Sequence, residues 1–125
     1  MELTEHRPGN YHVVRKITAD GIQIDDTSYS ESLILGARLL ETSWPVRSYA
    51  DLSSDSIEPL LTHQPEVVLL GFGEQQSFPP VEVQRRFLRA GVGLECMTLA
   101  AAARTFNVLM SENRRALAGL ILPTR

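Results

Sequence analysis

Cysteine, lysine and long apolar stretches are all scarce in this sequence of 125 residues. The single cysteine, Cys96, excludes an internal disulfide framework and any metal site built from several cysteines. The longest strongly apolar runs, Val67–Phe72 and Leu99–Ala103, are far shorter than the roughly 20 residues that a membrane-spanning helix needs. The N-terminal residues lack the basic start and apolar core of a signal peptide. We therefore expect a cytoplasmic protein that does not span a membrane.

Charge is distributed unevenly along the chain. Residues 1–80 hold five basic and twelve acidic residues, a net charge of −7, whereas residues 81–125 hold seven arginines and three glutamates, a net charge of +4. The overall charge of −3 makes nucleic acid an unfavourable partner. An arginine-rich C-terminal part suits an acidic partner, because the guanidinium group pairs with carboxylates and phosphates. Arginines that are solvated, or paired with the acidic half of the chain, are the simpler interpretation.

The N-terminal third has the turn signals and apolar spacing of β-strands. A hairpin is predicted over residues 11–24, with its turn at Ala19-Asp20-Gly21. A further strand is predicted at Tyr29–Gly36. Arg38–Val46 is predicted to be a short edge strand, because Pro45 donates no hydrogen bond to a neighbouring strand.

The rest of the chain alternates between helical and strand patterns. Cap-type residues between positions 51 and 55 begin a two-turn helix. The predicted elements after it are the strand Val67–Leu70, the helix Pro80–Arg89, the strand Val92–Leu94, the helix Leu99–Met110 and the strand Ala116–Leu122. The first of these strands is apolar without alternation, which indicates burial on both faces and a place at the centre of the sheet. Val83, Phe87 and Leu88 are predicted to face inward from the second helix.

This order of elements predicts one α/β domain over residues 1–125. A mixed central sheet carries the helices, and the N-terminal third forms a smaller β layer.

Two strand-turn-helix units share one plan and predict the position of a site. The first strand ends at Gly71-Phe72-Gly73-Glu74, and the second runs into Glu95-Cys96-Met97-Thr98, with Thr98 as the N-cap of the next helix. If the two strands are parallel and adjacent, both turns leave the same edge of the sheet, where open α/β sheets usually bind their ligands.

The glycines of the first turn form a weak nucleotide-loop pattern. The third glycine is missing, because Gln76 occupies its position, and Pro79 and Pro80 separate the loop from its helix. A tight exit turn is the better-supported interpretation.

Cys96 is a candidate nucleophile, because the start of a helix lowers the pKa of a thiol. A base would have to come from His6, His12 or His63, none of which a motif positions. A small core residue is the simpler interpretation, and no catalytic set or metal site can be assembled.

Arg104 and Thr105 lie among alanines and apolar residues of the third predicted helix, where an unpaired charge is costly to bury. Glu74 or Glu95 is predicted to pair with Arg104. The alternative is that Arg104 faces a bound anion.

Five segments together resemble one family. They are residues 20–25 (DGIQID), 28–35 (SYSESLIL), 44–46 (WPV), 65–80 (PEVVLLGFGEQQSFPP) and 91–123 (GVGLECMTLAAAARTFNVLMSENRRALAGLILP). They resemble the small single-domain family, mostly of unknown function, that includes mitochondrial respiratory complex I assembly factor three. The most specific matches are Gly71, Gly73-Glu74, Glu95, Met97-Thr98, Ala101-Ala102, Arg104–Asn107 and Leu109.

The resemblance implies a three-layer α/β fold and no established reaction. For the mitochondrial branch it implies a non-catalytic accessory that helps to assemble the NADH dehydrogenase complex at the inner membrane. This sequence has no mitochondrial targeting extension before its first predicted strand, as expected of a bacterial protein.

Our leading hypothesis is a non-catalytic, assembly-factor-like protein of bacterial type, without cofactor or metal, that binds a protein partner through the sheet-edge crevice. The partner is expected to be a membrane-complex subunit or a biogenesis factor. The alternative is a small-molecule or anion-binding protein, or a cryptic enzyme, that uses the same crevice. A third hypothesis is a structural subunit whose oppositely charged halves drive self-association into a homo-oligomer. The candidate crevice residues are Gly71, Gly73, Glu74, Glu95, Cys96, Thr98, Arg104 and Thr105.

Overall fold

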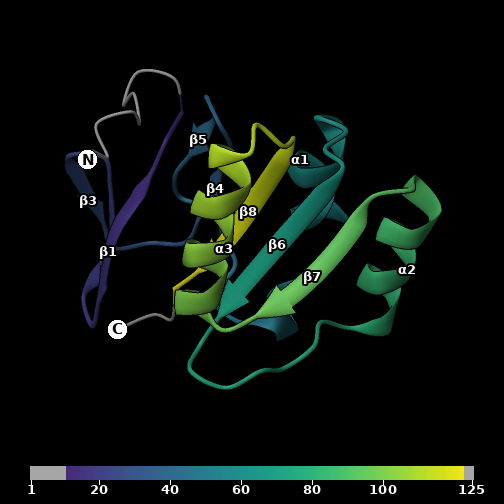
Figure 1. Cartoon of the computed structure of the whole chain (residues 1–125). Helices are drawn as coiled ribbons and strands as arrows, with labels where there is room; N and C mark the ends of the chain where they lie inside the picture. The colour runs from purple at the N-terminus through teal and green to yellow at the C-terminus, as the bar shows by residue number, and fades with distance from the viewer. Residues whose placement is uncertain (1–10, 123–125) are drawn as a thin grey trace.

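The computed structural model describes residues 11–122, which form two β-sheets and three α-helices (Figure 1). The smaller sheet is antiparallel and has the order β1-β2-β3, with β1 at Val14–Thr18, β2 at Gly21–Ile24 and β3 at Thr27–Tyr29. The larger sheet has the order β5-β4-β8-β6-β7. Its strands are β4 (Leu33–Leu35), β5 (Leu40–Glu41), β6 (Val67–Phe72), β7 (Gly93–Met97) and β8 (Ala116–Ile121).

The larger sheet is mixed, as predicted. Strand β6 is parallel to both β7 and β8, whereas β4 is antiparallel to β5 and β8. The prediction that β6 lies at the centre is wrong, because β8 occupies that place between β4 and β6. All six residues of β8 are buried. Their small and aliphatic side chains fit a strand that is covered on both faces.

The predicted strand Tyr29–Gly36 is two strands that belong to different sheets. Its first residue ends β3 and its later residues form β4, with a break at residues 30–32. Ser32 is buried at the break, where its hydroxyl donates to the carbonyl of Val46 and accepts the N–H of Leu122. The predicted edge strand Arg38–Val46 is confirmed as an edge, but only Leu40–Glu41 is paired.

Three layers result from the packing of the helices and the smaller sheet on the two faces of the larger sheet. Helices α1 (Ser54–Thr62) and α2 (Val81–Ala90) cover one face, together with buried aromatic residues of the segment 44–52. Helix α3 (Leu99–Ser111) and the three-stranded sheet cover the other face (Figure 1). The predicted three-layer α/β fold with a smaller N-terminal β layer is therefore confirmed.

The inward face of α2 is narrower than predicted. Val83 and Phe87 are buried, but the side chain of Leu88 is 80% exposed. Leu88 lies about 100° around the helix from Phe87, which turns it past the edge of the sheet. The prediction that Leu88 faces inward is wrong, and its exposure leaves an apolar side chain at the surface.

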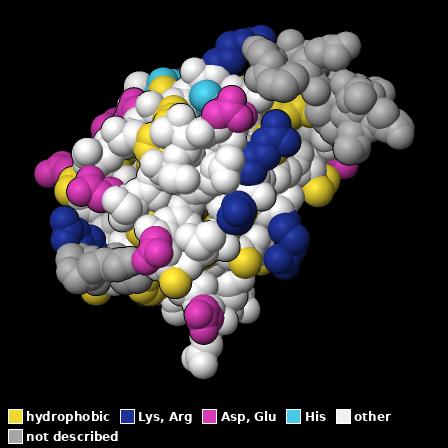
Figure 2. Space-filling view, turned by 90° about the vertical axis from the view of Figure 1, so that its left-hand side faces the viewer, with side chains coloured by type: hydrophobic (Ala, Val, Ile, Leu, Met, Phe, Trp, Pro, Cys, Tyr) yellow, Lys and Arg dark blue, Asp and Glu magenta, His cyan; other side chains and the backbone are white. Residues whose placement is uncertain are grey.

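Figure 2 looks onto the side of the molecule that carries the three-stranded sheet. In this view the hydrophobic side chains form small patches separated by acidic, basic and other polar surface (Figure 2).

Candidate functional site

The condition for the predicted crevice, that the strands of the two strand-turn-helix units are parallel and adjacent, holds. Strands β6 and β7 are parallel neighbours, with Val67 opposite Gly93 and Gly71 opposite Met97. Two hydrogen bonds join the turns that follow them. The N–H of Leu99 donates to the carbonyl of Gly73 at 3.0 Å, and the side-chain amide of Gln76 donates to the carbonyl of Cys96 at 3.2 Å. Both turns therefore leave one edge of the sheet and are tied to each other there.

The two glycines of the first turn have structural roles. Gly71 is buried beneath α3, and a Cβ atom at this position would lie 2.5 Å from Cβ of Ala102 and 3.3 Å from Cα of Leu99. Gly73 has φ of +72°, in the left-handed region that favours glycine. The absence of side chains thus lets α3 approach β6 and lets the chain turn immediately afterwards.

Most of the backbone N–H groups at the start of α3, which an anion would need as donors, already donate hydrogen bonds within the protein. Thr98 is the N-cap, as predicted, and its hydroxyl accepts the N–H of Ala101 at 3.2 Å. The N–H of Leu99 is bonded to Gly73. Among the described residues, Ala100 carries the one N–H of this first turn without a hydrogen bond. Anion binding at a helix start depends on several free N–H groups, so this arrangement gives it little support.

Cys96 does not lie at the start of a helix. It belongs to β7, and its half-buried side chain packs on the α1/α2 face of the sheet. Burial raises the pKa of the Cys96 thiol, and the negative charge of Glu95 acts in the same direction, against a hydrogen bond with Tyr49 that lowers it. The thiol is therefore kept protonated, contrary to the thiolate that a helix start would favour.

No histidine in residues 11–122 is placed to act on Cys96. The imidazole of His12 is hydrogen-bonded at 2.8 Å to Asp25, which follows β2. His63 caps the C-terminal end of α1, before the N-terminal end of β6, whereas Cys96 lies opposite Leu70 near the other end of that strand. His6 lies outside the described residues.

The polar group of Tyr49, which interacts with Cys96, is hydrogen-bonded to the backbone. Tyr49 is buried and its hydroxyl donates to the carbonyl of Leu70 at 3.1 Å. Burial of the ring raises the pKa of the Tyr49 hydroxyl. This hydroxyl serves as a hydrogen-bond donor within the core.

The prediction that Arg104 pairs with Glu74 or Glu95 is not met among the described residues. Arg104, Glu74 and Glu95 are all exposed, and the ion pairs between described residues do not include them. Arg104 has no hydrogen bond or ion pair within residues 11–122. Thr105 is half-buried on the same helix. The crevice residues are therefore spread over the sheet edge, the inside of the sheet and the outer part of α3.

Asn107 is an important side chain that our sequence-based site did not include. Its amide accepts the N–H of Val14 and donates to the carbonyl of Val14, both at 2.9 Å. These two bonds join α3 to β1 of the smaller sheet. An amide in the middle of an apolar helix was the signal that could have identified this contact.

Two arginines of the basic C-terminal part form ion pairs with glutamates of the acidic N-terminal part. Arg86 pairs with Glu58 on α1, and Arg114 pairs with Glu66 at 2.9 Å. The ion pair and a second bond from the N–H of Arg115 lower the pKa of Glu66. The interpretation of internally paired arginines thus holds for these residues, while Arg85 and Arg89 on α2 have no such partner among the described residues.

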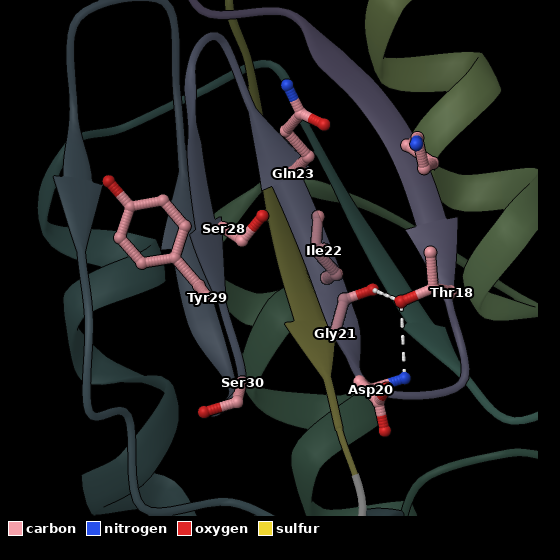
Figure 3. Close-up of a pocket in the computed structure, with 9 residues that line it drawn as sticks. Thr18, Asp20, Gly21, Ile22, Gln23, Ser28, Tyr29 and Ser30 are labelled. Atoms are coloured by element: carbon pink, nitrogen blue, oxygen red, sulfur yellow. Dashed lines mark hydrogen bonds between the residues drawn. The ribbon is translucent and has the colours of Figure 1, made fainter.

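Three hollows that described residues line lie away from the predicted crevice. A hollow of about 250 Å³ lies on the three-stranded sheet, beside the turn that Thr18 and Asp20 form (Figure 3). The hydroxyl of Thr18 is already engaged there, because it accepts the N–H of Asp20 and donates to the carbonyl of Gly21. A smaller hollow of about 230 Å³ lies next to it.

A larger groove of about 470 Å³ lies between α2 and β7. Its lining residues are Val81, Gln84, Arg85, Phe87, Leu88, Val92, Gly93 and Leu94. None of these belongs to the predicted crevice, and we call this surface the α2–β7 groove.

Neither a metal centre nor a membrane span is found in the described part of the chain. Residues 11–122 contain no cluster of three or more histidine, cysteine, aspartate or glutamate side chains that could hold a metal ion. None of the helices between these limits is long and apolar enough to cross a membrane.

Comparison with known proteins identifies a family and several relatives. A family model described as "Protein of unknown function (DUF498/DUF598)" matches residues 14–121. The chain is 32% identical over 87 residues to the "13 kDa major membrane protein" of Francisella tularensis subsp. holarctica, covering 69% of the chain and 71% of that protein. It is 32% identical over 114 residues to "NADH dehydrogenase [ubiquinone] 1 alpha subcomplex assembly factor 3" of Danio rerio, covering 89% of the chain. The match spans 64% of that assembly factor, so about a third of the relative lies outside it.

The fold also agrees with a solved structure. An NMR structure of a protein of Xanthomonas campestris superposes with a TM-score of 0.82 at 38% sequence identity, covering 98% of this chain and 92% of the other.

Proposed function

The chain belongs to the family described as "Protein of unknown function (DUF498/DUF598)", and from this membership we propose that it is a non-catalytic accessory protein that binds a protein partner during the assembly of a larger complex. The observation that carries the proposal is the similarity to an assembly factor of Danio rerio along 89% of the chain. That relative is named as an assembly factor of an NADH dehydrogenase subcomplex, and the partner class that we propose for this chain is a subunit or biogenesis factor of a membrane complex.

The arrangement of the side chains supports binding better than catalysis. The thiol of Cys96 is half-buried with a raised pKa, and the hydroxyl of Tyr49 is bonded to the backbone. A nucleophile needs a base within hydrogen-bonding reach, and neither described histidine supplies one.

We place the contact surface at the edge where the turns after β6 and β7 leave the sheet. The exposed side chains of Glu74, Glu95 and Arg104 would supply its polar contacts. The buried or half-buried members of the predicted set, Gly71, Gly73, Cys96, Thr98 and Thr105, would hold the turns and α3 in position. An acidic pair at this edge suits a partner surface that carries basic residues.

The test is recovery of a partner from detergent-solubilised membranes of the native host. We expect the tagged wild-type protein to retain a subunit or biogenesis factor of a membrane complex. The double substitution Glu74→Arg with Glu95→Arg should reduce that recovery at least tenfold, because it places positive charge against a basic partner. Glu41→Arg is the matched control, since Glu41 is an exposed glutamate on β5 at the opposite edge of the same sheet.

Equal recovery by all three proteins would place the partner on another surface. Absence of specific recovery over a range of salt concentrations and detergents would contradict the accessory role itself. Thermal unfolding in the presence of phosphate provides a separate check on the anion-binding alternative. A bound anion would raise the midpoint temperature, and we expect no change.

A further inference from the structure

The α2–β7 groove combines exposed apolar side chains with the free edge of a sheet. Leu88 is 80% exposed and Val81 is 59% exposed. Residues 81, 84, 85 and 88 all line the groove, and their spacing of three or four residues places them on one side of α2. This side lies next to the one that buries Val83 and Phe87. Exposed apolar side chains rimmed by polar residues often mark a site at which another molecule binds.

Among the strands of residues 11–122, β7 is the last of the larger sheet and is paired on one side only. The N–H of Gly93 donates to the carbonyl of Glu66, toward β6. Since backbone groups alternate along a strand, Glu95 and Met97 also point toward β6, while Leu94 and Cys96 point their N–H and C=O groups outward. The side-chain amide of Gln76 donates a hydrogen bond to the carbonyl of Cys96. The backbone of Leu94, which lines the groove, therefore has no pairing partner within residues 11–122 on this side.

The charge of the groove indicates which partner it suits. Arg85 lines the groove and Arg89 lies one turn further along α2. Both are exposed, and neither has an ion pair or hydrogen bond within residues 11–122. A carboxylate is the natural partner of such a guanidinium group. A second copy of this chain would bring the same arginines toward one another about a two-fold axis, and like charges disfavour that pairing.

We propose that the α2–β7 groove binds an extended segment of a partner protein, which adds as a strand beside β7 and carries apolar residues and a carboxylate. Its backbone pairs with Leu94. Alternate side chains point toward α2, where apolar ones cover Val81 and Leu88 and an acidic one meets Arg85. The lining of the groove does not include Glu74, Glu95 or Arg104, so the inference goes beyond the proposed function and does not depend on it.

The test is selection from a phage-displayed library of random twelve-residue peptides against the immobilised full chain. We expect enrichment of sequences with apolar residues at every second position and at least one aspartate or glutamate. Synthetic copies of the enriched peptides should bind in fluorescence anisotropy at least tenfold more weakly to Arg85→Glu and to Leu88→Asp than to the wild type. In NMR spectra their addition should shift the amide signal of Leu94.

Two matched controls separate this site from general effects of charge and apolar surface. Arg38→Glu reverses an exposed arginine beside the opposite edge of the sheet, and Val108→Asp replaces a 53% exposed side chain on α3. Both should bind the peptides as the wild type does. Circular dichroism of all four variants confirms that each is folded.

Three results would overturn the proposal. One is the absence of enrichment over a parallel selection against Leu88→Asp. Another is enrichment of peptides without acidic residues, or of peptides that bind Arg85→Glu unchanged. The third is a dimer in analytical ultracentrifugation that Leu88→Asp dissociates, since the groove would then be an interface between two copies.

Discussion

The two faces of the five-stranded sheet are covered by different means. Where the first turn of α3 lies over β6 the contact is made by small residues, since Gly71 of β6 lies against Ala102 of the helix, and Phe106 and Met110 fill the space further along α3. On the opposite face large side chains fill the space, among them Trp44, Tyr49 and Phe87. The comparison teaches that small residues let the start of one long helix approach the sheet closely, whereas bulky side chains fill the space beneath two shorter helices.

On each face of the sheet a glycine lies close to neighbouring atoms, and these atoms differ between the two glycines. A Cβ atom on Gly71 would meet α3 itself, at Cβ of Ala102 and Cα of Leu99. A Cβ atom on Gly119 of β8 would meet the indole ring of Trp44 and Cδ2 of Leu70, at 2.9 Å. Side chains can change their rotamers, whereas a helix has to move as a unit, so the α3 face should tolerate added volume less well.

The largest effect is expected for Gly71→Ala. The added methyl group forces α3 away from β6, and the free energy of unfolding should fall by about 3 kcal/mol. Urea denaturation followed by circular dichroism measures the change. Adding Ala102→Gly removes the clash, so the double variant should be more stable than the sum of the two single changes implies. Purely additive losses would contradict this packing.

A smaller loss is expected for Gly119→Ala on the opposite face. The Trp44 ring and the end of Leu70 can shift, and we expect the free energy of unfolding to fall by about 1.5 kcal/mol. The same denaturation experiment gives the value. The comparison between the two faces fails if this substitution costs as much as Gly71→Ala.

Tyr49→Phe should have a weaker effect. It removes the hydrogen bond to the carbonyl of Leu70 while keeping the ring in the core. Loss of the donor leaves a buried carbonyl without this partner, and we expect the free energy of unfolding to fall by about 1 kcal/mol. A stability equal to that of the wild type would show that the hydroxyl is not needed there.

The smallest effect concerns the reactivity of Cys96 rather than stability. Because burial raises the pKa of its thiol, less thiolate is present at pH 8 than in an unfolded chain. Alkylation by iodoacetamide should therefore be slower in the folded protein than in urea, and should accelerate as the pH rises above the usual range of thiols. A folded-state rate equal to the rate in urea would remove the case for a protonated, half-buried thiol.

The raised pKa values of Cys96 and Tyr49 also predict how the free energy of unfolding depends on pH. A group whose pKa is raised in the folded state stabilises that state at pH values below its unfolded pKa. The stabilisation is lost as the pH rises through the folded value. Cys96 and Tyr49 both act in this direction, so the free energy of unfolding should decrease on the alkaline side.

Local signals in the sequence were sufficient for most elements. The cap at Thr98 and the apolar run of β6 are read from neighbouring residues, and both predictions are confirmed. The adjacency of β6 and β7 was the condition on which the predicted site rested, and it also holds. These features depend on residues close together in the chain.

Other features depend on contacts that a sequence pattern does not contain. The break between β3 and β4 is associated with bonds from Ser32 to Val46 and Leu122, and Leu122 is 90 residues away. The pairing of β7 extends to Met97 opposite Gly71, which places Cys96 in a strand instead of at a helix start. The exposure of Leu88 depends on where the sheet ends. The α2–β7 groove was missed for this last reason.

The central position of β8 has a consequence for the order of folding. The β4–β5 hairpin and the parallel pair β6–β7 can each form early during synthesis, but β8 lies between them and is the last strand in the described part of the chain. Until residues 116–121 have been synthesised, each of these pairs exposes an apolar strand edge to its surroundings. Such nascent intermediates are prone to aggregation, and joining them requires contacts between distant parts of the sequence, which slows folding. The emergence of β8 from the ribosome therefore marks the step at which the larger sheet becomes continuous.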